Sequence, residues 1–543
     1  ALLSCLVYAN TLLYPFVYDD LELIHKQPAV TDPWDWGAVF GGQYWGPLLE
    51  QNTLYRPLTI WSLALNYRFH EIVGLEGRHP VGFRVVNILL HAGVSCLFFQ
   101  LLLRIRAPLG CGLAAALLFA AHPIHTEAVV SAANRSELLA ALFGLSFLIL
   151  HRQGRWVLAM GCYFLCMWSK ESGIAFFGLA VWMDFCLEHG SKRPYLGYGA
   201  MAVFWLSLRF LTVGNIDLEI PFLDNPLVDA SLLERVWTAG QVQFDYLKLQ
   251  VFPIGLSSDY SYREIPVLSS PIPLLGFVGV LIGALGLAWK TRRTHPLVGF
   301  AVVGYGILFS ITSNFLFPIG TIMGERLAYT PSLCFCLLVG YGVHSWFPKR
   351  IFIQAALLVL ACLGTVVRNQ TWADSGTFYS AQILSAPNSA RAHYGYGRWY
   401  LENGDRDLAV VHLLKAVEIL PIYVEAWGFL GITYMGKGDL EAALQAHKEG
   451  LRYAPNHVGT HFNLGRTYHV QGDLEAAAGA YLKALELDPD YQKAYVNLGS
   501  VRAEQGNLEA AEALWRRALE LDPAEKAVLD NLRRLEQLRR KDK

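Results

Sequence analysis

Eleven apolar runs, separated by short polar turns, occupy roughly the first two thirds of the chain. Inside a bilayer every backbone amide must find its hydrogen-bond partner within the protein, so runs of this kind are confined to helices. Several runs are shorter than the ~20 residues that cross a bilayer and must extend into flanking polar residues. The pattern predicts an all-α fold, a polytopic helical membrane bundle of about 11 transmembrane helices. The runs cover residues 1–17, 84–105, 108–122, 136–151, 154–169, 172–187, 194–212, 270–289, 296–315, 329–347 and 351–367.

The composition agrees with a membrane protein and argues against a nucleic-acid-binding one. Hydrophobic residues make up 54% of the chain and charged residues only 16%, whereas soluble domains contain about 25% charged residues. The net charge of −1 offers no basic excess to neutralise phosphates, so we expect no nucleic-acid partner.

Basic residues gather in alternate turns between the runs, and the positive-inside rule makes these turns cytoplasmic. The opposite side then receives the outer loops 18–83 and 213–269 and the whole C-terminal part. We expect a multi-pass protein of the bacterial inner membrane or the endoplasmic reticulum, with these parts in the periplasm or lumen. Acidic residues follow the first run where a cleavage site would need small ones, so we expect this run to be retained. The basic residues are Arg104, Arg106, Arg152, Arg155, Lys192, Arg193, Lys290, Arg292, Arg293, Lys349 and Arg350.

Proline recurs every 34 residues in the C-terminal part of the chain, and two series of glycines share this period. A 34-residue period with small residues, aromatic residues and a closing proline is typical of tetratricopeptide repeats. It predicts four repeats over residues 390–523 and a capping helix, so that 388–543 form an α-solenoid that follows a membrane domain, 1–369. Such solenoids bind peptides or proteins in a concave groove. The prolines are Pro387, Pro421, Pro455, Pro489 and Pro523.

Two adjacent carboxylates, Asp19 and Asp20, follow the first apolar run. A single acid at this position would mark the point where the helix meets water. A pair at the mouth of a polytopic bundle favours a functional role, because a charge near lipid is costly unless something uses it.

The second outer loop reads HPIHTEAVVSAANRSE and carries His122, His125 and Glu127, followed by Arg135. Two histidines three residues apart beside a glutamate could ligate a metal ion. They serve equally well as helix caps or as contacts to a substrate, and we favour this second interpretation.

Other charged residues lie at the outer ends of the runs or in the first outer loop. Lys170 and Glu171 end the fifth run, where they fit an ion pair at the membrane rim, and Lys170 also fits a contact to a ligand. Arg326, beside Glu325, opens the tenth run and fits a phosphate clamp or a snorkelling anchor. Arg56 lies in the first outer loop within the segment YRPLT.

The order of several short motifs resembles one family. FVYDD is followed by YRPLT, HPIHTEAV with NRSE, WSKESG, DNP at 224–226, GERLAYTPS and then the repeats. This order is similar to that of the transmembrane and tetratricopeptide-repeat O-mannosyltransferases, which are GT-C glycosyltransferases, and the resemblance covers essentially the whole chain. The chain departs from the family in having four repeats, where animal members carry more, and NRSE in place of a GRAE-like stretch.

The resemblance implies transfer of a sugar, with mannose as the leading candidate, from a polyprenyl- or dolichyl-phosphate donor to Ser or Thr hydroxyls of a protein acceptor. Transfer would take place on the extracytoplasmic face and would invert the configuration of the anomeric carbon. The repeats would dock the acceptor, and membrane lipids would surround the bundle. No cofactor would be required, and a need for a divalent cation stays open. Asp19 would be the base and Asp20 its positioning group. Arg326, Arg135 and Lys170 would hold the donor phosphate. His122, His125, Glu127, Arg56 and Glu325 would position the substrates.

Two other classes remain open from the residues alone. A lipid-linked-sugar flippase or transporter should carry charges at midplane depth and repeats among its spans, whereas the charges here cluster at one face. A polytopic scaffold that only displays its repeats would need no carboxylate pair. Within the enzymes, oligosaccharide transfer to Asn is the alternative, and the order of the motifs argues against it.

Overall fold

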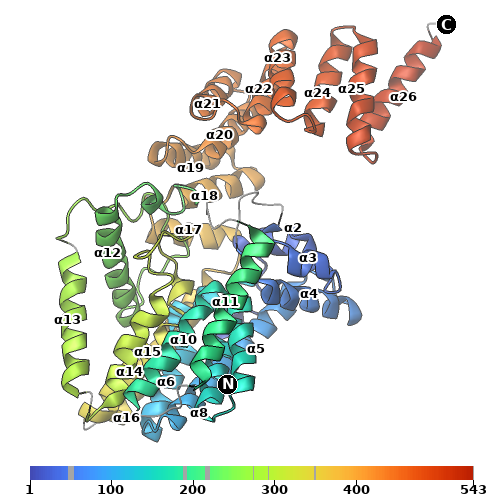
Figure 1. Ribbon diagram of the computed structural model, residues 1–543. Coiled ribbons are helices and arrows are strands. Elements are labelled where there is room, and N and C mark those ends of the chain that lie inside the picture. Colours follow the sequence, from blue (N-terminus) through green and yellow to red (C-terminus); the bar gives the residue numbers. More distant parts are fainter. Residues whose placement is uncertain are drawn as a thin grey trace. The chain divides into compact units, whose positions relative to one another are not determined.

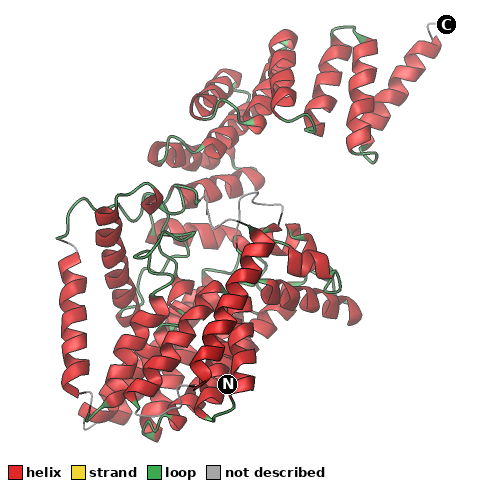
Figure 2. Ribbon diagram, in the orientation of Figure 1, coloured by secondary structure: helices red, strands yellow, loops and turns green. Residues whose placement is uncertain are grey.

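The computed structural model describes residues 1–46, 54–187, 193–214, 220–272, 274–291, 293–347 and 350–541. Within these ranges every regular element is a helix (Figure 2), which confirms the all-α prediction. The chain forms two compact units, Ala1–Pro387 and Asn388–Lys543. Lys192, Arg292 and Lys349 of the predicted basic turns lie outside the described residues.

Each of the eleven apolar runs contains a helix in the first unit (Figure 1). Four of these helices, α5, α11, α13 and α16, are long and apolar enough to cross a membrane. A fifth crossing results if α6 and the following segment Pro123–Val130, bent by 49° to it, count as one. The apolar helices make this a membrane protein, and the number of eleven crossings stays a prediction. The helices are α1 Leu2–Tyr8, α5 Pro80–Arg104, α6 Leu109–Ala121, α8 Arg135–Arg152, α9 Trp156–Ser169, α10 Ala175–Cys186, α11 Arg193–Val213, α13 Leu274–Thr291, α14 Pro296–Phe309, α15 Ser332–Trp346 and α16 Arg350–Gln370.

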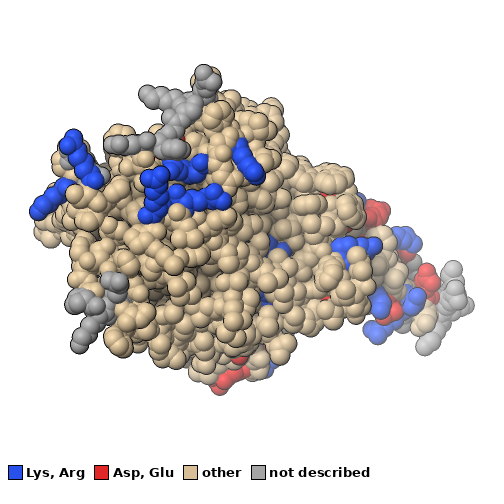
Figure 3. All heavy atoms as spheres, turned by 90° about the horizontal axis from the view of Figure 1, so that it is seen from below, with Lys and Arg blue, Asp and Glu red and all other residues tan. Residues whose placement is uncertain are grey.

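Polar contacts bring alternate helix ends together at one end of the bundle. His151 Nε2 near the end of α8 lies 2.9 Å from Asp184 Oδ2 near the end of α10. The Tyr195 hydroxyl, at the start of α11, donates to the same carboxylate oxygen at 2.6 Å. Figure 3 views the molecule from this end, where Lys and Arg side chains gather with few Asp or Glu beside them. Lys and Arg side chains therefore gather at one end of the bundle, as the alternation of basic turns predicts.

We expect that basic end to face the cytoplasm, because positive residues are retained on that side. A reporter fused after Arg293 should then be active in the cytoplasm, and one fused after residue 543 should be active in the opposite compartment. Paired phosphatase and fluorescent-protein fusions measure this. Finding both fusion points in the same compartment would contradict the orientation.

Short helices and loops cover the opposite end of the bundle. The first outer loop supplies α2 Asp19–Lys26, α3 Trp36–Gly41 and α4 Pro57–Ile72, and Pro57 begins α4 where its missing N–H costs nothing. A hydrophobic cluster that includes Leu23 and Ile60 holds these elements together. Three further elements here are α7 Thr126–Val130, α12 Leu232–Val251 and α17 Ser375–Ser385.

The second unit consists of helix pairs that follow the 34-residue period, which confirms the predicted repeats. Asp439 and Asp473 each cap the second helix of a pair by accepting a backbone N–H. Gly438 and Gly472 precede them in the left-handed conformation that ends the first helix. The helices are α18 Ala390–Glu402, α19 Arg406–Ile419, α20 Val424–Lys437, α21 Leu440–Tyr453, α22 Val458–Gln471, α23 Leu474–Leu487, α24 Gln492–Glu504, α25 Leu508–Leu521 and α26 Lys526–Lys541.

Candidate active site

The two adjacent acids at the start of α2 have different surroundings. Asp20 is fully buried, and its Oδ2 pairs with Arg84 Nη1 at 3.2 Å. Its Oδ1 accepts from the Ser131 hydroxyl at 2.7 Å and from the Ala133 backbone N–H at 2.9 Å. With both oxygens occupied inside the protein, Asp20 ties α2 to α5 and to the loop before α8.

Asp19 is partly exposed, and its charge acts on residues from distant parts of the chain. Burial lowers the pKa of the Arg326 guanidinium, but the carboxylates of Glu127 and Asp19 outweigh this effect and raise it above its usual value. The buried Tyr44 phenol also feels the charge of Asp19. Asp19 and Arg326, more than 300 positions apart in the sequence, therefore lie in one electrostatic neighbourhood.

Glu127 fixes Arg326 through two contacts. One carboxylate oxygen accepts from the Arg326 backbone N–H at 2.9 Å, and the other pairs with its guanidinium. Glu127 is almost completely buried, whereas 23% of the Arg326 side chain is exposed. The guanidinium is thus held from the protein side while part of it stays open to an anion.

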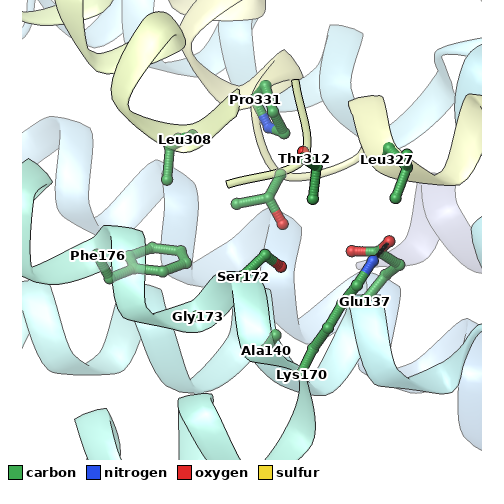
Figure 4. A pocket seen from close by; sticks show the side chains of 11 residues that line it. Glu137, Ala140, Lys170, Ser172, Gly173, Phe176, Leu308, Thr312, Leu327 and Pro331 are labelled. Atoms are coloured by element: carbon green, nitrogen blue, oxygen red, sulfur yellow. Dashed lines mark hydrogen bonds and ion pairs between the residues drawn. The ribbon is translucent and has the colours of Figure 1, made fainter. Parts of the chain in front are cut away.

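Lys170 pairs with Glu137 from the start of α8, and both side chains are buried. Figure 4 shows the ammonium and carboxylate pointing toward each other beside a small pocket. The pocket has a volume of about 10 Å³, enough for about one water molecule. Burial lowers the pKa of Lys170, and Glu137 counteracts this effect. Lys170 thus forms a buried ion pair with an acid 33 positions earlier in the chain and not a pair at the rim with its neighbour Glu171.

Glu171, the neighbour of Lys170, pairs instead with Arg56 at the start of α4, with Nε and Oε2 3.0 Å apart. Its other oxygen accepts from the Tyr55 backbone N–H at 3.2 Å. Burial works to raise the pKa of Glu171, but Arg56 and Lys170 outweigh it and hold the pKa below its usual range. Glu171 therefore anchors the first outer loop to the end of α9.

Glu325 is buried in a polar cluster beside Arg326. It accepts from the Tyr260 hydroxyl at 3.1 Å and lies 3.4 Å from Arg368 Nη2 in α16. Burial raises the pKa of Glu325, Arg368 lowers it and Glu127 raises it further, to about 7. Glu325 is therefore a buried carboxyl group that is bound by Tyr260 and Arg368. It is linked to the Glu127–Arg326 pair through its place in the chain, next to Arg326.

Among the described residues, the hydrogen bonds of Arg135 go to neutral acceptors. The buried guanidinium donates to Asn87 Oδ1 at 2.8 Å, to Asn66 Oδ1 at 3.0 Å, and to the backbone oxygens of Ser62 and Phe83 at 3.0 and 3.2 Å. These bonds join α4, α5 and α8. We therefore assign Arg135 a structural role in preference to contact with a donor phosphate.

The two histidines of the second outer loop bind neighbouring protein atoms with both ring nitrogens. His122 lies 2.9 Å from the Gln250 carbonyl and caps the turn at Ile124. His125 lies 2.8 Å from the Phe119 carbonyl and 2.7 Å from the Ser332 hydroxyl. Among the described residues no group of three His, Cys, Asp or Glu side chains is placed to hold a metal ion. These contacts favour the interpretation of both histidines as structural.

The sequence did not identify three ion-pair partners of the candidate site residues. These are Arg84, which pairs with Asp20, Glu171, which pairs with Arg56, and Arg368, which pairs with Glu325. Arg84 and Arg368 both lie in long apolar helices. A cation in such a helix is costly unless it is paired, and that signal could have found them.

Comparisons with known proteins agree with the motif order. Models of the tetratricopeptide repeat match residues 424–457 and 492–525, and a TPR repeat model matches 465–506. The chain is 27% identical over 456 residues to "Protein O-mannosyl-transferase F38B6.6" of Caenorhabditis elegans, covering 78% of this chain and 62% of that protein.

Two human relatives show the same degree of similarity. The chain is 28% identical to "Protein O-mannosyl-transferase TMTC4", covering 73% of this chain and 62% of that protein. It is 26% identical to "Protein O-mannosyl-transferase TMTC1", with coverages of 79% and 55%. The chain spans between about half and three fifths of the length of these curated relatives. The resemblance found from the motifs is confirmed.

Proposed function

We propose that this chain, a relative of proteins named protein O-mannosyl-transferase, transfers mannose from a polyprenyl- or dolichyl-phosphate donor to Ser or Thr hydroxyls of proteins. The observation that carries the proposal is the Arg326 guanidinium, which the buried Glu127 holds while 23% of the Arg326 side chain stays exposed. The Asp19 carboxylate helps to raise the pKa of this guanidinium. A carboxylate base and a partly exposed guanidinium are the groups that an acceptor hydroxyl and a leaving phosphate require.

The reaction needs one proton acceptor and one anion binder. The hydroxyl oxygen forms a bond to the anomeric carbon while the hydroxyl proton passes to the Asp19 carboxylate. The bond between that carbon and the phosphate oxygen breaks, and its electron pair leaves with the phosphate. Attack from the face opposite the leaving group inverts the anomeric carbon. The phosphate is a good leaving group, so no protein acid is required.

Arg326 is the residue we assign to the donor phosphate, because its side chain is partly exposed while its carboxylate partner is buried. Arg56 is exposed to a lesser degree and lies over the Tyr44 ring at 5.0 Å, next to the neighbourhood of Asp19. Lys170 is buried with Glu137, and its charge interacts with those of Arg56 and Arg326 without direct contact. Glu127 acts by orienting Arg326, and Glu325 acts by holding Tyr260 and Arg368 beside it, rather than by touching a substrate.

The repeats have the architecture of peptide-binding solenoids, and we assign them the protein acceptor. A docked acceptor is held near the site at a raised effective concentration. In this proposal the first unit performs the chemical step and the second unit selects the acceptor. Both the active site and the repeats lie on the extracytoplasmic side.

Purified protein in liposomes, supplied with radiolabelled dolichyl-phosphate mannose and a synthetic Thr-rich peptide, tests the proposal. We expect mannose on the threonine hydroxyl, with the anomeric configuration opposite to that of the donor. Movement of the labelled lipid across the membrane without labelled peptide would identify a flippase and contradict the proposal. Undecaprenyl-phosphate mannose in a parallel assay distinguishes the two classes of lipid carrier.

A further inference from the structure

The residue immediately before Asp19 has an unusual backbone conformation. Tyr18 has φ 55° and ψ −125°, a region that residues with a Cβ atom rarely enter. Such conformations persist only when the surrounding structure enforces them, and they concentrate at functional sites. A residue at this point sets the direction in which α2, and with it the Asp19 carboxylate, leaves the first apolar segment.

The Tyr18 ring is held by the segment that follows the last apolar helix. It packs against Phe378 in α17, with ring centroids 5.2 Å apart. Phe378 in turn packs against Trp372 at 4.9 Å, and both of these side chains are almost completely buried. Buried aromatic side chains from α17 and from the turn before it therefore support the strained residue.

A second set of contacts fixes the first apolar segment upstream of Tyr18, at Val7 and Asn10. The Asn369 amide donates to the Val7 carbonyl and to Asn10 Oδ1, each at 2.9 Å. Asn10 donates back to the Val366 carbonyl at 3.4 Å. The segment 366–378 thus contacts the first part of the chain at two places, at Val7 and Asn10 and again at Tyr18.

We propose that Phe378 is a positioning residue for Asp19: through the Tyr18 ring it keeps the carboxylate aimed at the acceptor hydroxyl. The inference rests on the proposed function of Asp19 and adds to it a residue from the segment that joins the membrane bundle to the repeats. Phe378 itself touches no substrate in this account. Without its ring, Tyr18 can relax to a negative φ, and the carboxylate leaves its productive position.

The test is a double-mutant cycle in the full chain, assayed with dolichyl-phosphate mannose and the Thr-rich peptide. Misplacing a reacting group by about 1 Å can cost up to a hundredfold in rate. We expect Phe378→Ala to lower kcat about ten-fold and to leave the KM for the donor unchanged. In an Asp19→Asn background, Phe378→Ala should not lower the residual rate further. Leu384→Ala removes an exposed apolar side chain from the same helix and serves as the matched control with unchanged kcat.

The possible outcomes separate the two claims. Equal losses from Phe378→Ala in both backgrounds, or no loss in either, would overturn the positioning role. Full turnover by Asp19→Asn alone would instead overturn the proposed function. If a melting curve shows that Phe378→Ala does not fold, Phe378→Leu and Tyr18→Leu keep the apolar volume without the ring pair. Each of these variants must then lower kcat in the protein that retains Asp19 and leave the residual rate of the Asp19→Asn protein unchanged.

Discussion

Replacing Asp20 by alanine is expected to lower the free energy of unfolding by about 3–5 kcal/mol, because it leaves the buried Arg84 guanidinium without its carboxylate partner. Arg84 and Asp20 are both almost completely inaccessible to solvent. The substitution also removes the acceptor for the Ser131 hydroxyl and the Ala133 N–H. The loss should appear as a large fall in the melting temperature of the purified protein in detergent.

Two comparisons make this result specific. The double variant Asp20→Leu/Arg84→Met should recover much of the loss, because replacing a buried ion pair by apolar residues is often nearly neutral. Glu22→Ala removes an acid from the same helix whose partner, Lys26, is exposed. It should change the stability by no more than about 1 kcal/mol. A melting temperature for Asp20→Ala equal to that of Glu22→Ala would contradict the structural role of Asp20.

The helices and the repeats could be predicted because each leaves a periodic or compositional signal in the sequence. Apolar runs in a bilayer have no alternative to the helix, and each predicted run contains one. The 34-residue period places glycine where a left-handed backbone ends a helix, as at Gly438 and Gly472. The number of membrane crossings is harder to predict, because most of the eleven helices are too short or too polar to be recognised as a span by themselves.

Candidate residues for the site could be proposed from the sequence, but their ion-pair partners could not. Lys170 and Glu171 are neighbours and look like one ion pair, yet Lys170 pairs with Glu137 and Glu171 with Arg56. Neighbouring residues at a helix end point in different directions, so packing between helices decides the partners. The same holds for Asp20, whose partner Arg84 is 64 positions away.

Sequence reasoning also could not separate a substrate contact from a structural one. Arg135 and Arg326 are both cations at the outer ends of apolar runs. The first is enclosed by neutral acceptors from α4 and α5, whereas the second is held by Glu127 with part of its side chain open. Burial, which depends on the assembled bundle, distinguishes them.

Asp19→Asn carries the largest expected effect on turnover. The amide is close in shape to the carboxylate and cannot take up the hydroxyl proton, so the variant lacks only the base. Removal of a general base typically costs about 10²–10⁴ in rate. Because Asp19 is partly exposed and outside the buried pair of Asp20 and Arg84, folding should be nearly unaffected. Donor binding should also persist, since Arg326 keeps its main partner Glu127.

The rate of mannose transfer by purified Asp19→Asn, measured beside its melting temperature and its affinity for dolichyl-phosphate mannose, tests the role of Asp19 most directly. We predict a fall in kcat of about 10²–10⁴ with the melting temperature and donor affinity of the unchanged protein. Transfer at the full rate by this folded, donor-binding variant would contradict the assignment of Asp19 as the base.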